Sequence, residues 1–254
     1  MSQVLLLAQR SIVRTLRQPA MVVPSILFPL LLLSINSSGL NSATLLPGFP
    51  ADSYFQFAIA IPFIQGALFS AMSAGTNVAS DIESGFLNRL SLTPLRRVAL
   101  MLGQLTGILG LGLIQALTFL VVGLVFGDGL AAGPGGAGVL ILLSLTISLG
   151  FGSIGAFVAL RTGNGEAVQG VFPLFFAALF LSSMSLPRDL IETDWYRTVA
   201  TWNPVSYMLE GIRSLFITGW DGEALALGFA CAAGVAAVAI AAASMALRTR
   251  MVRT

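Results

Sequence analysis

Six long stretches of this sequence contain no charged residue. They are residues 20–51, 53–80, 98–127, 129–160, 167–187 and 224–247. Each stretch is long enough to cross a bilayer, because a helix that spans the hydrocarbon core needs about 20 predominantly apolar residues. Only 9% of the 254 residues are charged and 56% are hydrophobic. Soluble domains carry about 25% charged residues, so a soluble fold is excluded.

The apolar stretches predict an all-α integral membrane protein that forms a single transmembrane domain over residues 1–254. The six expected spans cover, to within a few residues, 21–40, 55–79, 98–126, 137–160, 167–186 and 224–247. Helices are expected because lipid offers the backbone no hydrogen-bond partner. The segments also lack the alternation of polar and apolar residues that is typical of a membrane β-barrel.

Arginine is distributed unevenly among the connections. The chain has no lysine, and ten of its 13 basic residues lie in residues 1–19, 80–97, 161–166 and 248–254. The connection 187–223 instead holds six acidic residues and three arginines. Because positively charged loops remain in the cytoplasm during membrane insertion, both termini are expected on the cytoplasmic side.

Several functional classes are disfavoured by residue types that the chain lacks. It has no histidine and one cysteine, Cys231, so we expect no zinc or haem site and no other metal site. The net charge of only +2 argues against a nucleic-acid partner. A phosphate-binding loop of the Gly-x-x-x-x-Gly-Lys type needs a lysine, so this chain is not expected to bind ATP or to be an enzyme by itself.

Two alternatives to an ATP-driven transporter subunit depend on groups inside the membrane. An ion-coupled secondary transporter normally places carboxylates or broken helices with coordinating groups at the bilayer midplane. A membrane-embedded enzyme needs a nucleophile, an acid or a metal within reach of one another. Because the expected spans are uncharged, both remain the less favoured interpretations.

Residues 1–19 predict an amphipathic helix that lies on the membrane surface. Arg10, Arg14 and Arg17 share one face of a helical wheel. The opposite face is apolar and comprises Leu5, Ala8, Ile12 and Leu16. Such a helix binds at the interface through its apolar face. The alternative is a simple cytoplasmic extension.

The connection between the second and third spans predicts a short helix with a sharp exit. Ser80 and Glu83 have the spacing of a capping box, and Asp81 favours the positive start of a helix. Thr93 and Pro94 suit the N-cap and the first position of the next span.

Ile82, Phe86 and Leu90 repeat every four residues along one face of this short helix. An apolar ridge exposed to the cytoplasm is suited to insertion into the groove of a partner protein. The alternative is an interfacial helix that contacts lipid headgroups.

The end of the connection before the last span predicts a second amphipathic helix. Asn203 is a good N-cap and Pro204 a good first helical residue. One apolar stripe comprises Val205, Met208, Leu209, Ile212, Leu215 and Phe216. Glu210 and Arg213 lie three residues apart on the other side. We expect this helix to dip into the outer leaflet and to act as a gate, with the Glu210 and Arg213 pair placing charge at its opening. The alternative is a passive lid anchored at the interface by Trp195, Trp202 and Trp220.

These two segments resemble the ABC type-2 permease family, most closely its daunorubicin-resistance-like branch of drug and lipid exporters. Asp81-Ile-Glu-Ser-Gly-Phe-Leu-Asn-Arg-Leu-Ser-Leu-Thr-Pro94 is similar to the acidic-Gly-x-Leu-x-Arg-Leu-x-x-Thr-Pro pattern of that family. Asn203-Pro-Val-Ser-Tyr-Met-Leu-Glu-Gly-Ile-Arg213 is similar to its Asn-Pro segment before the final span. Phe86 departs from the pattern, since many members carry Thr or Val there.

The resemblance implies an N-terminal interfacial helix, a cytoplasmic coupling helix in residues 80–97 and an external re-entrant hairpin in residues 187–223. It also implies a second permease subunit, either identical or a paralogue, and two separate ABC ATPase subunits that hold ATP and Mg²⁺. The setting that it implies is a bacterial cell membrane. The coupling element would comprise Asp81, Glu83, Gly85, Phe86, Arg89, Leu90, Thr93 and Pro94. The external gate would comprise Asn203, Pro204, Tyr207, Glu210 and Arg213.

Neutral polar and aromatic residues in the spans predict a path for amphipathic drugs or lipid-like molecules. The candidate path residues are Gln56, Phe63, Gln65, Phe69, Asn77, Gln115, Phe119, Phe172, Phe175 and Phe176. For any single one of them, helix packing is the alternative role. Lipid-linked polysaccharide, which other members of the family carry, is the alternative cargo.

Overall fold

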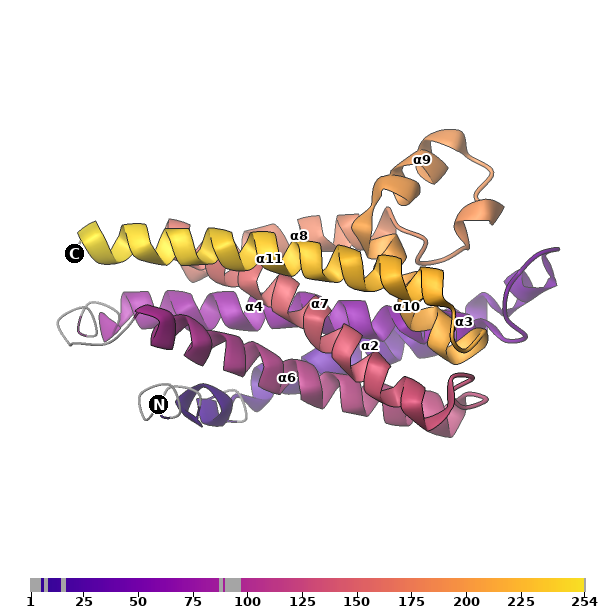
Figure 1. Ribbon diagram of the computed structural model, residues 1–254, viewed down its shortest axis with the longest axis horizontal. Helices are drawn as coiled ribbons and strands as arrows, with labels where there is room; N and C mark the ends of the chain where they lie inside the picture. Colours follow the sequence, from indigo (N-terminus) through magenta and orange to yellow (C-terminus); the bar gives the residue numbers. More distant parts are fainter. Residues whose placement is uncertain (1–5, 7–8, 15–16, 87–88, 90–96, 254) are drawn as a thin grey trace.

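The structure is a computed structural model that describes residues 6, 9–14, 17–86, 89 and 97–253, and these residues form helices and no strand (Figure 1). The longer helices are α2 (Pro19–Gly39), α4 (Ala60–Glu83), α6 (Arg97–Phe126), α7 (Gly133–Thr162), α8 (Gly165–Phe180), α10 (Pro204–Ile217) and α11 (Gly222–Arg253). The shorter ones are α3 (Tyr54–Ala58), α9 (Asp194–Trp202) and the 3-10 turns η1 (Asn41–Leu45) and η2 (Arg188–Leu190).

Five helical segments of the described chain are long and apolar enough to cross a membrane. They are α2, α3 continuing into α4, α6, α7 and α11. Their bounds agree with the first four and the last of the expected spans to within about six residues. The all-helical membrane fold is therefore confirmed.

The fifth expected span is shorter than its apolar stretch. α8 ends at Phe180, whereas the sequence predicts helix to residue 186, and turns follow it. Side chains bind carbonyl groups at this end of the helix. The Asn203 side chain donates to the carbonyl oxygens of Ala178 and Leu181, and the Ser182 hydroxyl donates to that of Leu179. At 1.5 Å per residue, the 16 residues of α8 rise about 24 Å, less than the roughly 30 Å hydrocarbon core.

α4 is the central helix of the bundle. It packs against α2, α6, α7, α8 and α10. In its most apolar window 83% of the residues are buried, against 17% in α2 and 22% in α11. Since lipid would contact mainly the peripheral helices, α4 has a protein environment along nearly its whole length.

Glycine permits the close crossing of α4 and α7. A Cβ atom on Gly155 of α7 would overlap the carbonyl oxygen of Ala71 on α4. Small residues let helix backbones approach in this way in membrane proteins. The crossing fixes the central part of α4 against α7.

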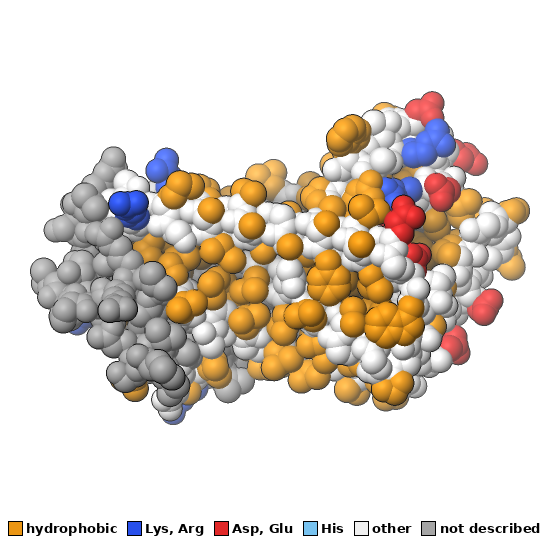
Figure 2. Space-filling view, viewed as in Figure 1, with side chains coloured by type: hydrophobic (Ala, Val, Ile, Leu, Met, Phe, Trp, Pro, Cys, Tyr) orange, Lys and Arg blue, Asp and Glu red, His pale blue; other side chains and the backbone are white. Residues whose placement is uncertain are grey.

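The two ends of the bundle differ in what they carry. The N-terminal helix, described over residues 9–14, and the end of α11 lie at the end where α4 finishes, as the arginine distribution predicts for segments that share one side (Figure 1). The opposite end carries η1, α9 and the turn before α11, and acidic side chains gather there in Figure 2. We call the end where α4 finishes the inner end and the opposite one the outer end, and these names denote ends of the bundle, not sides of the membrane.

The expected capping box at the inner end is wrong. α4 continues through Ser80, Asp81 and Glu83, and the backbone N–H of Ser84 donates to the Ser80 carbonyl oxygen. An N-cap needs non-helical backbone, and nothing in this segment breaks the helix before Gly85. Gly85 has a φ of +67°, the left-handed conformation that commonly ends helices at glycine. The connection therefore begins at Gly85, one helical turn later than predicted.

Candidate functional site

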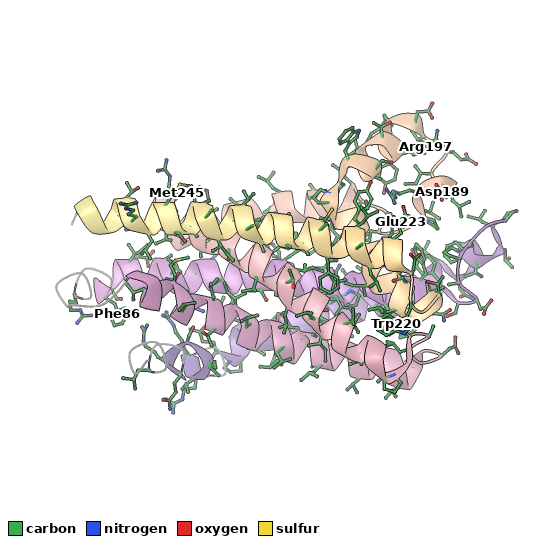
Figure 3. The ribbon with its side chains drawn as sticks, viewed as in Figure 1. Phe86, Asp189, Arg197, Trp220, Glu223 and Met245 are labelled. Atoms are coloured by element: carbon green, nitrogen blue, oxygen red, sulfur yellow. The ribbon has the colours of Figure 1, made fainter. Side chains whose placement is uncertain are left out.

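At the inner end, Asp81 joins α4 to the N-terminal helix. Its carboxylate accepts hydrogen bonds from the guanidinium groups of Arg14, at 2.7 Å, and Arg10, at 3.0 Å. The Arg10 guanidinium also lies 4.0 Å from the centre of the Phe86 ring, a cation–π distance. Figure 3 labels Phe86 beside the end of α4. Two arginines predicted to face the cytoplasm thus contact two residues predicted for coupling.

The N-terminal helix also packs on α6. A Cβ atom on Gly107 would overlap the Ser11 hydroxyl, so the two helices are in close contact. A small pocket of about 60 Å³ lies between this helix, α4 and α6. Asn77, Asp81, Arg14 and Gln104 are among the residues that line it. Asn77 therefore lines the same pocket as the coupling candidates Asp81 and Phe86.

Two further coupling candidates, Glu83 and Arg89, form hydrogen bonds at the end of α4. The Glu83 carboxylate accepts a 3.4 Å hydrogen bond from the backbone N–H of Gly165, the first residue of α8. A carboxylate is favourable at this positive helix start. The Arg89 guanidinium donates to the Ser84 carbonyl oxygen at 3.3 Å and so folds back over the end of α4. Leu90, Thr93 and Pro94 lie outside the described residues.

At the outer end, α10 begins as the sequence predicts. The Asn203 side chain accepts a hydrogen bond from the Val205 backbone N–H, and Pro204 is the first helical residue. The whole predicted apolar stripe, from Val205 to Phe216, is buried against the protein. α10 therefore packs on α4 and α11 rather than presenting this stripe to lipid.

The predicted pairing of Glu210 with Arg213 is wrong. Glu210 forms a 2.6 Å ion pair with Arg188 and accepts a 3.2 Å hydrogen bond from the Ser183 hydroxyl. The Arg188 guanidinium also lies 4.4 Å from the centre of the Tyr207 ring. The partner of Glu210 thus comes from η2, which cannot be predicted from the spacing of residues within α10.

Arg213 points into the protein and is 5% exposed. Its guanidinium donates to the carbonyl oxygens of Phe57 at 3.0 Å, Ser183 at 2.6 Å and Met184 at 2.6 Å. These acceptors belong to the last turn of α3 and to the turn after α8. Burial lowers the pKa of Arg213 to about 9, although the nearby Glu210 carboxylate opposes that change. Arg213 thus stays charged at neutral pH and fastens α10 to two helix ends.

The ion pair and Arg213 share a pocket of about 330 Å³ that opens at the outer end. Its lining includes Arg188, Asp189, Glu210, Arg213 and Asp221. Charged groups of both signs surround this opening, as expected for a polar mouth above uncharged spans.

The polar path candidates have different surroundings. Gln56 donates to the Phe216 carbonyl oxygen at 3.4 Å. Gln115 accepts from Ser70 at 3.1 Å and donates to Ser25 at 3.0 Å, which links α6 to α4 and α2. The buried Oε1 atom of Gln65 has no hydrogen-bond partner among the described residues. Gln115 therefore links three helices, whereas Gln65 keeps an unused acceptor.

The aromatic path candidates divide into three groups. Phe63 and Phe119 contact each other in the buried core, and Phe175 packs against Phe151 of α7. Phe69, Phe172 and Phe176 form a partly exposed group with Phe28, and ring centres in successive contact are 5.0 to 6.1 Å apart. We call these four residues of α2, α4 and α8 the aromatic cluster.

Comparison with known proteins decides the family. The ABC-2 type transporter family matches residues 2–217, which include both ends of the bundle just described. The chain belongs to the ABC-2 type transporter family. It is a membrane subunit of a transporter, and permeases of this family work with ABC ATPase partners.

Relatives of this ABC-2 chain are named transport permease ycf38. The protein of Porphyra purpurea is 28% identical over 218 residues, which cover 85% of this chain and 74% of the relative. The protein of Cyanophora paradoxa is 26% identical over 216 residues, with 84% and 74% covered. That of Pyropia yezoensis is 26% identical over 212 residues, with 83% and 72% covered.

Sequence reasoning missed several residues of this ABC-2 permease. Arg188 gave no signal, because it lies in a connection without helical periodicity. The sequence predicted that Arg10 and Arg14 form a basic face on the same side of the membrane as Asp81. That shared side was the available signal for their ion pairs with Asp81. Ser183, like the buried serines that bind Gln115, is too common a residue type to stand out.

Proposed function

We propose that this chain is the permease subunit of an ATP-driven exporter. Two copies of an ABC ATPase hydrolyse ATP with Mg²⁺, and this chain contributes no cofactor. A second permease subunit, identical or paralogous, completes the path. The observation that carries the proposal is that the described coupling residues gather with the N-terminal helix at one end of α4, in a member of a family that works with ABC ATPases.

The proposed topology has six crossings with both termini in the cytoplasm of a bacterial cell. α8 is the fifth crossing, because a short helix is accommodated by local thinning of the bilayer. Ten of the 13 arginines lie in the connections that would face the cytoplasm, in agreement with the positive-inside rule. The hairpin of α9 and α10 then lies on the outside, as the re-entrant element.

Site-specific labelling tests this topology, and the single native cysteine makes it simple. In a Cys231→Ala background, Ser84→Cys and Thr218→Cys provide one exposed thiol at each end. A membrane-impermeant maleimide is expected to label Thr218→Cys in intact cells and Ser84→Cys only after permeabilisation. The reverse pattern would overturn the topology.

The proposed coupling element is the end of α4 with the turn that follows it. Glu83→Gln and Arg89→Gln are expected to abolish cargo-stimulated ATPase activity in the reconstituted complex while the ATPase still co-purifies. Arg161→Gln is the matched control, since Arg161 is exposed in the last turn of α7 at the same end. Stimulation that stays unchanged in both test variants would remove this segment from the mechanism.

The proposed external gate centres on Glu210 and Arg188. Their ion pair is partly exposed at the opening of the outer pocket. Glu210→Gln is expected to slow export severalfold while ATPase binding stays intact. Loss of the ATPase partner instead would place this end on the cytoplasmic side.

The proposed cargo is an amphipathic drug or lipid-like molecule. The aromatic cluster offers partly exposed apolar surface, and the unpaired acceptor on Gln65 offers one polar contact. Transport by proteoliposomes would be measured with a panel of amphipathic drugs and with labelled lipid-linked glycans. A strict preference for the glycans would assign the polysaccharide as cargo and overturn this proposal.

A further inference from the structure

α9 presents an apolar ridge that no described part of the protein covers. Trp195, Val199 and Trp202 follow the i, i+4, i+7 spacing of one helical face. They are 64%, 38% and 84% exposed. In Figure 1, α9 stands away from the bundle at its outer end.

The other faces of α9 have different roles. Ala200 is buried, and the Tyr196 hydroxyl donates to the carbonyl oxygens of Phe180 at 2.9 Å and Ser182 at 3.0 Å. That face therefore fastens α9 to the end of α8. Arg197 pairs with Asp194 on a third, polar face, and Figure 3 shows Arg197 at the outer edge of the molecule.

The length of α8 places α9 at the boundary of the membrane. Gly165 lies at the inner end, where its N–H binds Glu83. Sixteen residues of helix then bring Phe180 about 24 Å across a hydrocarbon core of roughly 30 Å. Since Tyr196 binds the Phe180 carbonyl oxygen, α9 shares that depth.

The surface next to the ridge is also apolar. Leu174 and Phe180 of α8 are 67% and 55% exposed, as expected for side chains that face lipid. The hydrogen bond from the Tyr196 hydroxyl to the Phe180 carbonyl oxygen places α9 beside the outer end of this helix. Tryptophan is enriched at the membrane–water interface, where its ring contacts acyl chains and its N–H contacts water or headgroups.

We propose that α9 is an interfacial anchor whose Trp195, Val199 and Trp202 insert into the lipid headgroup boundary, with Arg197 and Asp194 facing water. This assigns to α9 the lipid contact that the sequence predicted for α10, and it uses two of the three tryptophans that the alternative interpretation named as anchors. The proposal rests on the proposed crossing of the membrane by α8, and it holds whichever end faces the cytoplasm.

The three tryptophans of the chain provide the test, because all of them lie in the outer region. Substituting two at a time by phenylalanine leaves one fluorophore, at position 195 or 202. The permease is placed in nanodiscs whose phosphatidylcholine carries a nitroxide near the headgroup end of the acyl chain. We expect the lipid nitroxide to quench both positions strongly and aqueous iodide to quench them weakly. Nanodiscs expose both membrane faces, so this result does not depend on the topology or on the ATPase.

The matched control places a tryptophan on the polar face of the same helix. Thr201 is exposed and lies next to Trp202 but points to the Arg197 side. Thr201→Trp, in a chain whose three native tryptophans are phenylalanine, is expected to show the opposite preference, with stronger quenching by iodide. Iodide quenching of positions 195 and 202 equal to that of position 201 would show that the ridge is in water and would overturn the proposal. Protection of positions 195 and 202 from both quenchers would show that protein, such as a second copy, covers the ridge, and would overturn it equally.

Discussion

The two ends of α4 hold arginine in opposite ways. At the inner end, Arg10 and Arg14 share the Asp81 carboxylate at a partly exposed site. At the outer end, Arg213 is buried and donates to three backbone carbonyl groups. The first arrangement joins side chains to a side chain, and the second joins a side chain to the backbone at two helix ends.

This difference separates a part that can rearrange from a part that is fixed. Exposed ion pairs contribute roughly 0 to 1 kcal/mol and are weakened by salt, so they can break and reform. Breaking the bonds of a buried charge costs more, because the charge and its acceptors are left without partners. We therefore expect α10, the turn after α8 and the end of α3 to move as one body. The pair of Glu210 and Arg188 is the outer contact that can open.

The strongest test of this contrast is removal of the Arg213 guanidinium. Arg213→Met keeps much of the side-chain volume but leaves the carbonyl groups of Phe57, Ser183 and Met184 without this donor. We expect a loss of about 3 kcal/mol in the free energy of unfolding. Thermal unfolding in detergent would measure it. Arg197→Met is the control, since its exposed pair with Asp194 is worth under about 1 kcal/mol, and equal effects would contradict the contrast.

A second test concerns the connection between the two ends. Gly155→Ala would place a Cβ atom against the Ala71 carbonyl oxygen, so α4 and α7 must separate. We expect a loss of about 2 kcal/mol and weaker coupling between cargo and ATPase activity. Gly138→Ala lies in the same helix with no atom within 4 Å of the added Cβ, and we expect it to be neutral or stabilising. The same melting temperature for both variants would show that the crossing tolerates bulk.

The hydrogen bonds of Gln115 are the third test. Gln115→Leu removes the link between Ser25 of α2 and Ser70 of α4. We expect a loss of about 1 kcal/mol, the usual size of such bonds between membrane helices. Gln169→Leu, at an exposed position of α8, is the control and should leave the melting temperature unchanged. Loss of transport with unchanged stability would instead favour a place on the cargo path.

The smallest effect on stability is expected at Asp81. Asp81→Asn weakens both ion pairs, yet the loss should stay under about 1 kcal/mol because the site is partly exposed. The stability difference between this variant and the unchanged chain should shrink further at high salt, whereas that for Arg213→Met should persist. Melting curves at low and high salt would measure both, and a salt-independent difference for Asp81→Asn would place that carboxylate in a buried role.

At the outer end, the sequence predicted the helices better than it predicted the hydrogen-bond and ion-pair partners of their side chains. The start of α10 at Asn203 and Pro204, and its buried stripe, follow from local rules of capping and periodicity. The partner of Glu210 does not, because Arg188 is 22 residues away and only the fold brings it close. The same holds for Arg213, whose acceptors are backbone atoms of Phe57 and Ser183 that no residue pattern reveals.

At the inner end the sequence misplaced a boundary. The Ser80 and Glu83 spacing indicates a helix start, but the preceding helix simply continues until Gly85. A capping-box spacing favours a new helix start, but a helix that is already formed tends to continue. The spacing rule considers only the first of these two effects. The predicted end of α8 was wrong for a related reason, because hydrophobic residues continue beyond Phe180 while the side chain of Asn203, from a distant segment, binds the carbonyl groups of Ala178 and Leu181.

The buried position of α4 has a consequence for biosynthesis. Chains are made from the N-terminus, so α4 enters the membrane before α6, α7, α8 and α10 have been synthesised. During that interval the amide of Gln65 and the hydroxyl of Ser70 face acyl chains instead of protein. Newly made permease therefore passes through a stage in which its central helix is exposed and open to capture by insertion factors, and the covering of α4 is complete only when α10 has been made.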